Sequence, residues 1–594
     1  MTINLETLNG LSLYLPYEMS RTEGGERFPP RITVTRESSV YTVNREGSED
    51  RCDHLDNSYG DSASRNSRDD PGNGYRLDDS IYEVVEKGLQ WQQCHAKLAE
   101  AMTISMPIGV IASTHSQDWE PREKDLKCYF HFDRLLGKKT AIRIANDPDS
   151  VAKHSFFPLI RFHESWTKFR KDAKPKKKIR PLRYAAHIDA AIYARYRSLL
   201  SPLYENELSK RGIPNVPVAY RRILQQDGKA KSNIEIAREV FERVRQIGDC
   251  IVTVVDIKSY FESLDHHIIK ENWELLLGYP LPPDHLAVYK SVTKYSVVDY
   301  DKLISRLELL EKPRVGSRKT RRRRKIDQLR VDRLKQICSP ADFRKLVAGG
   351  EAGKPSLIQK NGFPFGIPQG TPISDLIANF YLLDFDSEIN DWAAARGGIY
   401  RRYSDDIVVV LPVSQVETQY ECKSHLQARI GDYGPKLRIQ DKKVCIVEFS
   451  RNGEEMDFTN VFGTSSRNGL EYLGFEFDGK VVKIKNSTLS NAWRKMKRQA
   501  YGYAFQYVKR YSLKGEGWIR SNYPYRHLET KILRDVTYNQ DTGYETWTFV
   551  KYARRASRAF VGFKPIFSKQ TKLYRYYTKT MISEALDRAI KSVL

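Results

Sequence analysis

YRRYSDDIVVV, residues 400–410, places the adjacent acids Asp405 and Asp406 between two apolar-rich runs. Two short runs of this kind joined by polar residues predict a β-hairpin with the carboxylates in its turn. Asp-Asp in a turn is common, because Asp tolerates turn geometry and hydrogen-bonds its own backbone. Taken alone, the pair is equally compatible with a structural turn and with a metal-binding turn.

A second strand that ends in an acid lies upstream, at IVTVVD, residues 251–256. Between the two acidic sites lies FGIPQGTPIS, residues 365–374, a Gly/Pro loop that allows backbone to approach a ligand closely. An apolar helix is expected after it, over residues 377–385. Carboxylates that converge from a strand end and a hairpin suit Mg²⁺, and two such ions clamp the attacking and leaving oxygens of a phosphoryl displacement.

Composition favours a soluble, basic protein with a polyanionic partner. The 594 residues are enough for several domains, and the net charge is +24 although no lysine precedes Lys87. The seven cysteines include no C-x-x-C pair, so neither a zinc site nor a disulfide framework is expected, and a reduced cytoplasmic location fits. No apolar run approaches the ~18 residues of a membrane span, and no signal peptide is expected.

Elements before the first acidic strand are predicted from periodicity and capping residues. Residues 1–80 are expected to be mostly irregular, with one strand within Arg31–Val43. A helical pattern begins at Asp79, and further helices are expected over His187–Leu203 and Asn233–Ile247.

Beyond the Asp-Asp hairpin, the pattern alternates between helix and strand. A helix is expected over Val413–Ile430, followed by strands at Leu437–Ile439 and Val444–Val447. Asp478-Gly479, flanked by LEYLGFEF and VVKI, predicts a hairpin. From Ser490 onward the pattern is helical, and its aromatic residues alternate with Lys and Arg. That suits single-stranded nucleic acid, although a helical core with a basic surface has the same pattern.

Two basic segments are candidates for binding phosphate. KPKKKIRP, residues 174–181, reads as a loop that contains Lys178 and Arg180, and arginine holds phosphate oxygens in bidentate geometry. Residues 297–350 look like an insertion with a dense basic cluster that would favour backbone phosphates without reading sequence. A solvated surface is the alternative for both. The cluster residues expected at a nucleic-acid backbone are Arg321, Arg322, Arg323, Arg324 and Lys325.

The order of these elements resembles the reverse transcriptases. Asp256 with Phe261 is similar to the first catalytic strand of that family. The loop at 365–374, followed by Asn379, resembles the loop and helix that hold nucleotide and template. Tyr403-Ser404-Asp405-Asp406 is similar to the family's Tyr-x-Asp-Asp box.

Further motifs extend the resemblance over residues 170–485. Lys443 matches the lysine that follows the box, and Arg180 with Pro181 resembles the fingers motif that contacts the triphosphate. Asp375 departs from the proline that the family usually has after the serine of the loop. The residues that match the primer-grip hairpin are Tyr472, Leu473, Gly474 and Phe475.

The resemblance implies an α+β, right-hand polymerase fold with fingers, an antiparallel palm sheet and a mainly α-helical C-terminal domain. Residues 1–80 would form an N-terminal extension, 81–250 a fingers-type region and 251–485 the palm. The basic insertion at about 297–350 lies within the palm. Residues 486–594 would form a thumb-like domain or one that binds nucleic acid or mediates oligomerisation.

The resemblance also implies RNA-directed DNA polymerase chemistry. Asp256 and Asp405 would bind two Mg²⁺ ions, or Mn²⁺ in their place, with help from the Ile257 carbonyl. Asp406 would lie close by and tune the site. Lys443 would protonate or neutralise the leaving pyrophosphate. Phosphoryl transfer of this kind depends on positioning and charge neutralisation.

The nucleotide site follows from the same resemblance. Lys178 and Arg180 would hold the triphosphate of a dNTP, and Gln369 with Gly370 would contact the nucleotide or template base. Phe261 would block the sugar 2′ position and so exclude ribonucleotides, although a core phenylalanine is the structural alternative.

Among bacterial types, the insertion and the aromatic helical tail look most like the abortive-infection and defence-associated "unknown group" enzymes. An anti-phage role is therefore expected, with either a non-coding RNA template or protein-primed, untemplated synthesis. The expected partners are dNTPs, template RNA or product DNA, and further copies of the chain or a partner defence protein, with no membrane. A maturase-like RNA-binding protein or scaffold with a vestigial polymerase core is the alternative, and Phe261 argues against an RNA-dependent RNA polymerase.

Overall fold

The structure is a computed structural model in which the larger of two compact units holds the residues of interest. The smaller unit comprises Met1–Tyr59 and Tyr538–Tyr544. In it, β1 (Ile32–Arg36) and β2 (Ser39–Val43) form an antiparallel hairpin, so the single strand expected there is wrong. The helix expected from Asp79 and the basic cluster at 321–325 lie outside the described residues. The structure describes residues 32–36, 39–43, 119–168, 176–309, 335–463, 468–533, 536–539 and 544–594.

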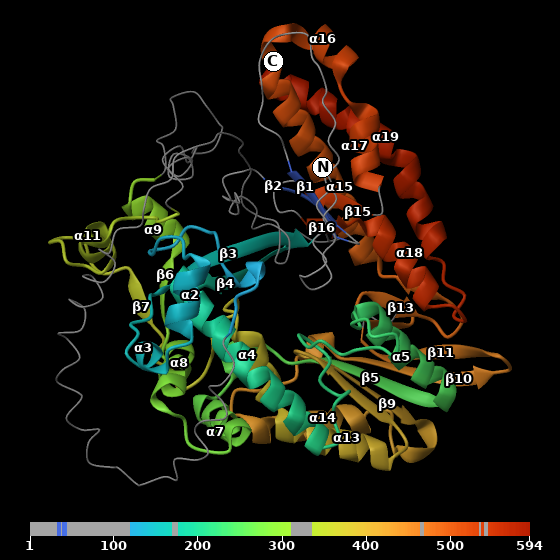
Figure 1. The fold of residues 1–594 in the computed structure, drawn as a ribbon. Helices are drawn as coiled ribbons and strands as arrows, with labels where there is room; N and C mark the ends of the chain where they lie inside the picture. The colour runs from blue at the N-terminus through green and yellow to red at the C-terminus, as the bar shows by residue number, and fades with distance from the viewer. Residues whose placement is uncertain are drawn as a thin grey trace, which may run out of the picture. The chain divides into compact units, whose positions relative to one another are not determined.

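The larger unit contains a five-stranded antiparallel sheet in the order β11-β10-β5-β9-β8, at the lower right of Figure 1. Alternate residues of β5 enter two different cores: Ile251 belongs to one, and Val252 to the other. A strand covered on both faces reads as a continuous apolar run, which explains the sequence of this strand. The strands are β5 (Cys250–Asp256), β8 (Ile399–Tyr403), β9 (Asp406–Pro412), β10 (Cys445–Asn452) and β11 (Glu455–Phe462).

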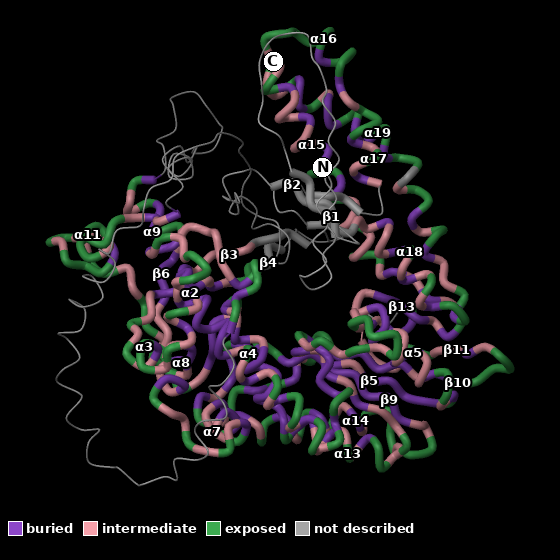
Figure 2. The backbone as a smooth tube through the Cα atoms, in the orientation of Figure 1, coloured by how far each residue is buried: buried purple, intermediate pink, exposed green. Residues whose placement is uncertain are grey.

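Helices cover both faces of this sheet, as the buried central strands in Figure 2 show. α5 (Asn233–Ile247) has the expected bounds, since Ser232 and Glu235 form a capping box at its start. The helix expected over 377–385 is instead two, α12 (Ser374–Phe380) and α13 (Leu383–Ala395).

The helix expected over Val413–Ile430 is too long. Residues Val413–Gln415 form a short 3₁₀ turn, and α14 covers only Glu421–Ile430. The Glu421 carboxylate accepts a hydrogen bond from the Glu417 backbone amide at 2.8 Å, which satisfies a donor just ahead of the helix and fixes where the helix starts.

A second sheet has the order β4-β3-β6-β7, and only its β3–β6 pair is parallel. The basic segment expected to be a loop belongs to β4 from Lys176 onward, because it pairs with β3 over its whole length. The helix that follows, α4 (His187–Lys210), begins where expected and is longer than predicted. The strands are β3 (Leu159–Lys168), β4 (Lys176–Tyr184), β6 (Ser296–Asp299) and β7 (Ile358–Lys360).

A three-stranded sheet follows the central one in sequence. The hairpin predicted at Asp478-Gly479 is confirmed, because β13 (Phe475–Phe477) pairs with β14 (Val482–Ile484). The apolar run that precedes this hairpin, residues 470–477, is not one continuous strand. Leu473 and Gly474 have φ values of 44° and 90° and make a second turn within it. β12 (Leu470–Tyr472) therefore pairs with β13 as a second hairpin.

The C-terminal part is mainly helical, as expected. α15 (Asn486–Arg510) and α19 (Phe567–Val593) pack along each other through a core rich in alanine. The start of α19 joins the core beneath the three-stranded sheet through Phe567. No helix among the described residues is long and apolar enough to span a bilayer.

The described residues also form shorter helices and one further pair of strands. The helices are α2 (Lys138–Ala145), α3 (Pro148–Ala152), α6 (Tyr260–Ser263), α7 (His266–Leu277), α8 (Pro283–Thr293), α9 (Tyr300–Arg306), α11 (Pro340–Asp342), α16 (Gly515–Asn522), α17 (Tyr525–Leu533) and α18 (Phe549–Ala559). The remaining strands are β15 (Val536–Asn539) and β16 (Tyr544–Trp547).

Candidate active site

The Asp-Asp stretch forms the predicted hairpin. Tyr403 at the end of β8 pairs with Asp406 at the start of β9, and Ser404 and Asp405 make the turn. Ser404 has a φ of 59°, in the left-handed region that a tight two-residue turn requires. The turn thus presents Asp405 at its tip and Asp406 on the first residue of a central strand.

Strand register brings the third acid to the same place. Asp256, the last residue of β5, lies directly opposite Asp406. Side chains of directly opposed residues in an antiparallel pair project from the same face, so these two carboxylates are neighbours. The backbone amide of Ile257 donates to the Asp405 carbonyl at 2.9 Å, which ties the end of β5 to the turn.

Like charges in a partly buried setting change the titration of these acids. Burial, together with the negative charges of the neighbouring Asp405 and Asp256, raises the pKa of Asp406 to about 7. Burial and Asp256 also raise the pKa of Asp405, while Lys443 and Arg180 oppose that shift. The three acids therefore form a site in which added positive charge is stabilising.

Lys443 supplies positive charge at this site. The backbone amide of Gln440 donates to the Asp256 carbonyl at 2.8 Å, and a 3₁₀ turn over Asp441–Lys443 follows. The Lys443 ammonium group forms an ion pair with the Asp256 carboxylate. The structure thus places the predicted lysine directly on a predicted catalytic acid.

The donor set matches a hard cation in its chemistry. Carboxylate oxygens are the ligands that Mg²⁺ takes in phosphate-handling sites. Within the described part of the chain, however, no three Asp, Glu, His or Cys side chains are arranged to hold a metal ion. The Lys443 ammonium group is paired with Oδ2 of Asp256, so a divalent cation could take this oxygen only in place of the lysine.

The Gln-Gly loop is fixed between two elements. On one side the amide of Ile367 donates to the Phe261 carbonyl at 2.8 Å. On the other, the amide of Arg183 in β4 donates to the Gln369 carbonyl at 2.9 Å. Gly370 has a φ of 118°, and a Cβ there would collide with the Arg183 carbonyl oxygen, so only glycine fits.

These contacts bring most of the predicted nucleotide residues together. Gln369 and Gly370 lie against β4, the strand that carries Arg180, and Arg180 lies close enough to lower the pKa of Asp405. Phe261 is only 9% exposed and lies at the edge of the core beside the loop. Lys178 lies in β4, and its side chain is outside the described atoms.

A buried ion pair behind the turn is a feature that the sequence interpretation missed. Arg402 and Asp386 are both fully buried, with Nε of Arg402 2.7 Å from Oδ1 of Asp386. Arg402 also donates to the carbonyls of Ser404 at 3.3 Å and Asn379 at 2.9 Å. Strand alternation marks position 402 as inward-facing, which signals a buried arginine, but its partner on α13 leaves no local signal.

The acid that departs from the family pattern has a structural partner. Asp375 accepts two hydrogen bonds from Nη1 of Arg197 in α4, at 2.6 and 2.7 Å. The same guanidinium nitrogen donates to the Pro372 carbonyl at 2.9 Å. Burial raises the pKa of Asp375, and Arg197 opposes that shift. Asp375 therefore anchors the Gln-Gly loop to α4.

The predicted primer-grip residues form a hairpin turn beside the acids. The rings of Tyr472 and Phe475 are buried, at 3% and 0% exposure. The turn backbone is held by Asn233, which donates to the Leu473 carbonyl at 3.1 Å, and by the Lys485 amide, which donates to the Gly474 carbonyl at 3.0 Å. Burial raises the pKa of Tyr472, and the Asp406 charge contributes, which places this hairpin near the acids.

Comparison with known proteins finds distant structural similarity alone. No family model and no curated protein matches the chain. A telomerase from Candida albicans, solved with a fragment of telomeric RNA, is 12% identical with a TM-score of 0.28, over 75% of this chain and 64% of that chain. An apo telomerase from Candida tropicalis is 14% identical with a TM-score of 0.30, over 78% and 71%. Similarity at this level does not by itself establish a shared fold or activity.

Proposed function

We propose that the chain is a reverse transcriptase-type DNA polymerase that adds dNTPs by metal-assisted phosphoryl transfer. The arrangement of three acids at one end of an antiparallel sheet carries the proposal: Asp256 opposes Asp406, and the Ile257–Asp405 hydrogen bond holds the turn beside them. The Gln-Gly loop, which is the other half of the resemblance, is bonded to the strand that carries Arg180. These contacts between motifs that are far apart in the sequence support the proposal.

Each of the chain's own residues then has a role in that reaction. Asp256 and Asp405 would hold Mg²⁺, which when bound supplies the charge that stabilises the attacking and leaving oxygens. Asp406 keeps the local charge negative, and its carboxylate favours cation binding once it is deprotonated. Lys443, once released from its ion pair with Asp256, would neutralise or protonate the leaving pyrophosphate.

The substrate would be held by the loop and by β4. Arg180 offers a planar guanidinium to the triphosphate oxygens, while Gln369 offers a donor and an acceptor to the base. Phe261, at the edge of the core, would lie against the sugar 2′ position and favour dNTPs over rNTPs. The same proposal extends to a role in bacterial anti-phage defence, with a non-coding RNA template or with protein-primed synthesis.

The test is incorporation of labelled dNTPs by the purified chain with Mg²⁺. Asp405→Ala is expected to reduce incorporation at least about a hundredfold, because a metal ion contributes several kcal/mol of charge stabilisation. Asp391→Ala is the control, since Asp391 is an exposed acid on α13. Incorporation that survives in the Asp405 variant, or that is unaffected by EDTA, would contradict the proposal.

The same preparation separates the modes of synthesis. The chain is incubated with each dNTP or rNTP without added template or primer, and the product is digested with nuclease or protease. DNA that remains attached to protein until proteolysis indicates protein priming. DNA that disappears after RNase pre-treatment indicates a co-purified RNA template. Tight RNA binding without incorporation would favour the RNA-binding scaffold instead.

A further inference from the structure

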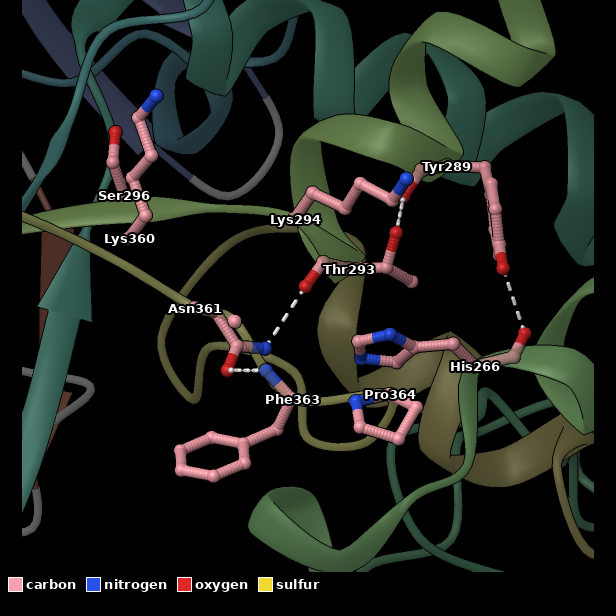
Figure 3. A pocket seen from close by; sticks show the side chains of 10 residues that line it. His266, Tyr289, Thr293, Lys294, Ser296, Lys360, Asn361, Phe363 and Pro364 are labelled. Atoms are coloured by element: carbon pink, nitrogen blue, oxygen red, sulfur yellow. Dashed lines mark hydrogen bonds between the residues drawn. The ribbon is translucent and has the colours of Figure 1, made fainter.

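A second concave site lies beside the Gln-Gly loop and has no part in the chemistry above. It is a cavity of about 710 Å³ between the start of α7, the end of α8 and the segment that follows β7 (Figure 3). This volume falls within the range of sites that bind small molecules, about 300–1,000 Å³.

The walls of the cavity are fixed by internal hydrogen bonds. The hydroxyl of Tyr289 donates to the His266 carbonyl at 2.8 Å, and Nδ2 of Asn361 donates to the Thr293 carbonyl at 2.9 Å (Figure 3). These polar groups are therefore already paired within the protein. A ligand would find a pre-formed shape and would have to be recognised by the remaining groups.

The remaining groups are cationic and aromatic. Lys294 and Lys360 line the cavity and are exposed, and no acidic side chain lines it. Phe363 is 65% exposed, which is unusual for a phenylalanine on a fixed loop. Its ring stacks on that of Phe365, with centroids 5.2 Å apart and planes inclined by 25°. The ammonium group of Lys436 lies over the Phe365 ring at 5.2 Å from its centroid.

This combination has the chemistry of a nucleotide unit. A base stacks on an aromatic face whatever its identity, and ammonium groups attract the phosphate. A hydrophobic or acidic ligand would satisfy only one of the two features. An aromatic surface braced from behind by a second ring, with cations beside it, therefore favours single-stranded nucleic acid.

The segment that lines the cavity leads directly into the Gln-Gly loop of the candidate active site. The amide of Gly366 donates to the Leu264 carbonyl at 2.7 Å, and the next residue is bonded to Phe261. Phe363 precedes Gln369 by six residues, so the two lie at most about 20 Å apart. A strand with a base at Gln369 reaches that far with about six stacked nucleotides at ~3.4 Å each.

We propose that this cavity binds one nucleotide unit of a single strand that runs from the polymerase site, with the base on Phe363 and the phosphate near Lys294 and Lys360. The inference extends the proposed function, but its test is binding alone. If the chain binds a single strand through Phe363 but does not polymerise, the cavity is still confirmed as a nucleotide-binding site. If the chain polymerises but its affinity for a single strand does not depend on Phe363, the proposed role of the cavity is refuted and the proposed polymerase activity is not.

The experiment measures the fluorescence anisotropy of labelled single-stranded DNA and RNA 12-mers with the full chain. Phe363→Ala is expected to weaken binding about 5- to 150-fold, the effect of one lost base-stacking contact, with the salt dependence unchanged. Tyr420→Ala, which removes another exposed aromatic ring (44% exposed), is the control and should bind as the wild type does. Equal affinity of the Phe363 variant and the control would overturn the proposal.

A second variant tests the phosphate contact independently. Lys294→Gln combined with Lys360→Gln should lower the slope of log K against log[salt] by up to about 1.4, since each phosphate contact on a single strand contributes about 0.7. An unchanged slope would overturn the phosphate assignment. Competition with AMP distinguishes the two sources of a nucleotide unit. If AMP binds as tightly as the 12-mer, and does so only when Phe363 is present, the cavity is a site for a free nucleotide. That result would refute the proposal that it binds a single strand.

Discussion

Substitution of Asp386 by Asn tests whether the buried ion pair positions the turn that carries Asp405. Arg402 and Asp386 are both 0% exposed, and Asp386 accepts from Nε and Nη2 of Arg402 and from the Tyr400 hydroxyl. Removing one partner of such a pair leaves an uncompensated buried charge. We expect Asp386→Asn to cost about 3–5 kcal/mol of unfolding free energy, a large share of the ~5–15 kcal/mol that stabilises a typical domain.

The assay is urea denaturation followed by circular dichroism, with a neighbouring acid as control. Asp384 lies on the same helix and pairs with Arg211 at 2.5 Å, but it is 60% exposed. Because solvent screens that pair, Asp384→Asn should change stability by less than about 1 kcal/mol. A cost below about 1 kcal/mol for Asp386→Asn would refute the reasoning.

A double substitution separates stability from positioning. Asp386→Leu with Arg402→Met replaces the pair by apolar side chains, which is often close to neutral for stability. We therefore expect the double variant to regain most of the lost unfolding free energy. Activity should stay at least about tenfold low, because Arg402 no longer donates to the Ser404 carbonyl next to Asp405. Full recovery of dNTP incorporation would show that the pair serves stability alone.

Three further substitutions probe the site and the fold. Phe261→Ala should admit rNTPs as substrates, and unchanged discrimination between dNTPs and rNTPs in single-nucleotide incorporation would contradict the role of the ring. Gly370→Ala should reduce dNTP incorporation at least about tenfold, since its Cβ would collide with the Arg183 carbonyl and displace the loop; a fully active variant would show that the loop can shift. Burial lowers the pKa of His131 to about 4, below its unfolded value near 6.5, so the neutral ring stabilises the fold above that value and stability falls as the pH drops through this window. His131→Phe should remove up to about 1.4 kcal/mol per pH unit of that dependence between pH 6.5 and 4.5, measured by urea denaturation, and an equal dependence in both proteins would contradict it.

Local patterns were sufficient for the hairpin and its acids. Two apolar-rich runs joined by adjacent acids predict strands on either side of the turn, and a capping box fixes the start of α5. The apolar pattern of residues 470–477 continues through the Leu473-Gly474 turn, so the turn between β12 and β13 is indicated only by the resemblance to the primer-grip hairpin. The positive φ of Gly474 reverses the direction of the chain, but no polar residues interrupt the apolar run at this point. The hydrophobic pattern alone therefore does not reveal the turn.

Local sequence patterns did not predict the contacts between residues that are far apart in the sequence. KPKKKIRP has the composition of a loop, yet it is a strand because β3 pairs with it, and a strand partner supplies the hydrogen bonds that local propensity does not. The Arg197–Asp375 pair joins residues that are far apart in sequence. An ion pair of this kind is selected by the folded arrangement, so neither residue carries a signal of its own.

Three acids of like charge in a partly buried place repel one another, and burial together with this repulsion raises the pKa of Asp405 and of Asp406. The contacts that oppose it are mostly backbone ones. Strand register fixes Asp256 against Asp406, and the Ile257 amide fixes Asp405. Because these bonds are independent of protonation and of any bound cation, the acids stay together when the site is empty of metal. The ion pair between Lys443 and Asp256 offsets part of this repulsion. In the proposed mechanism, a bound divalent cation would take over that role.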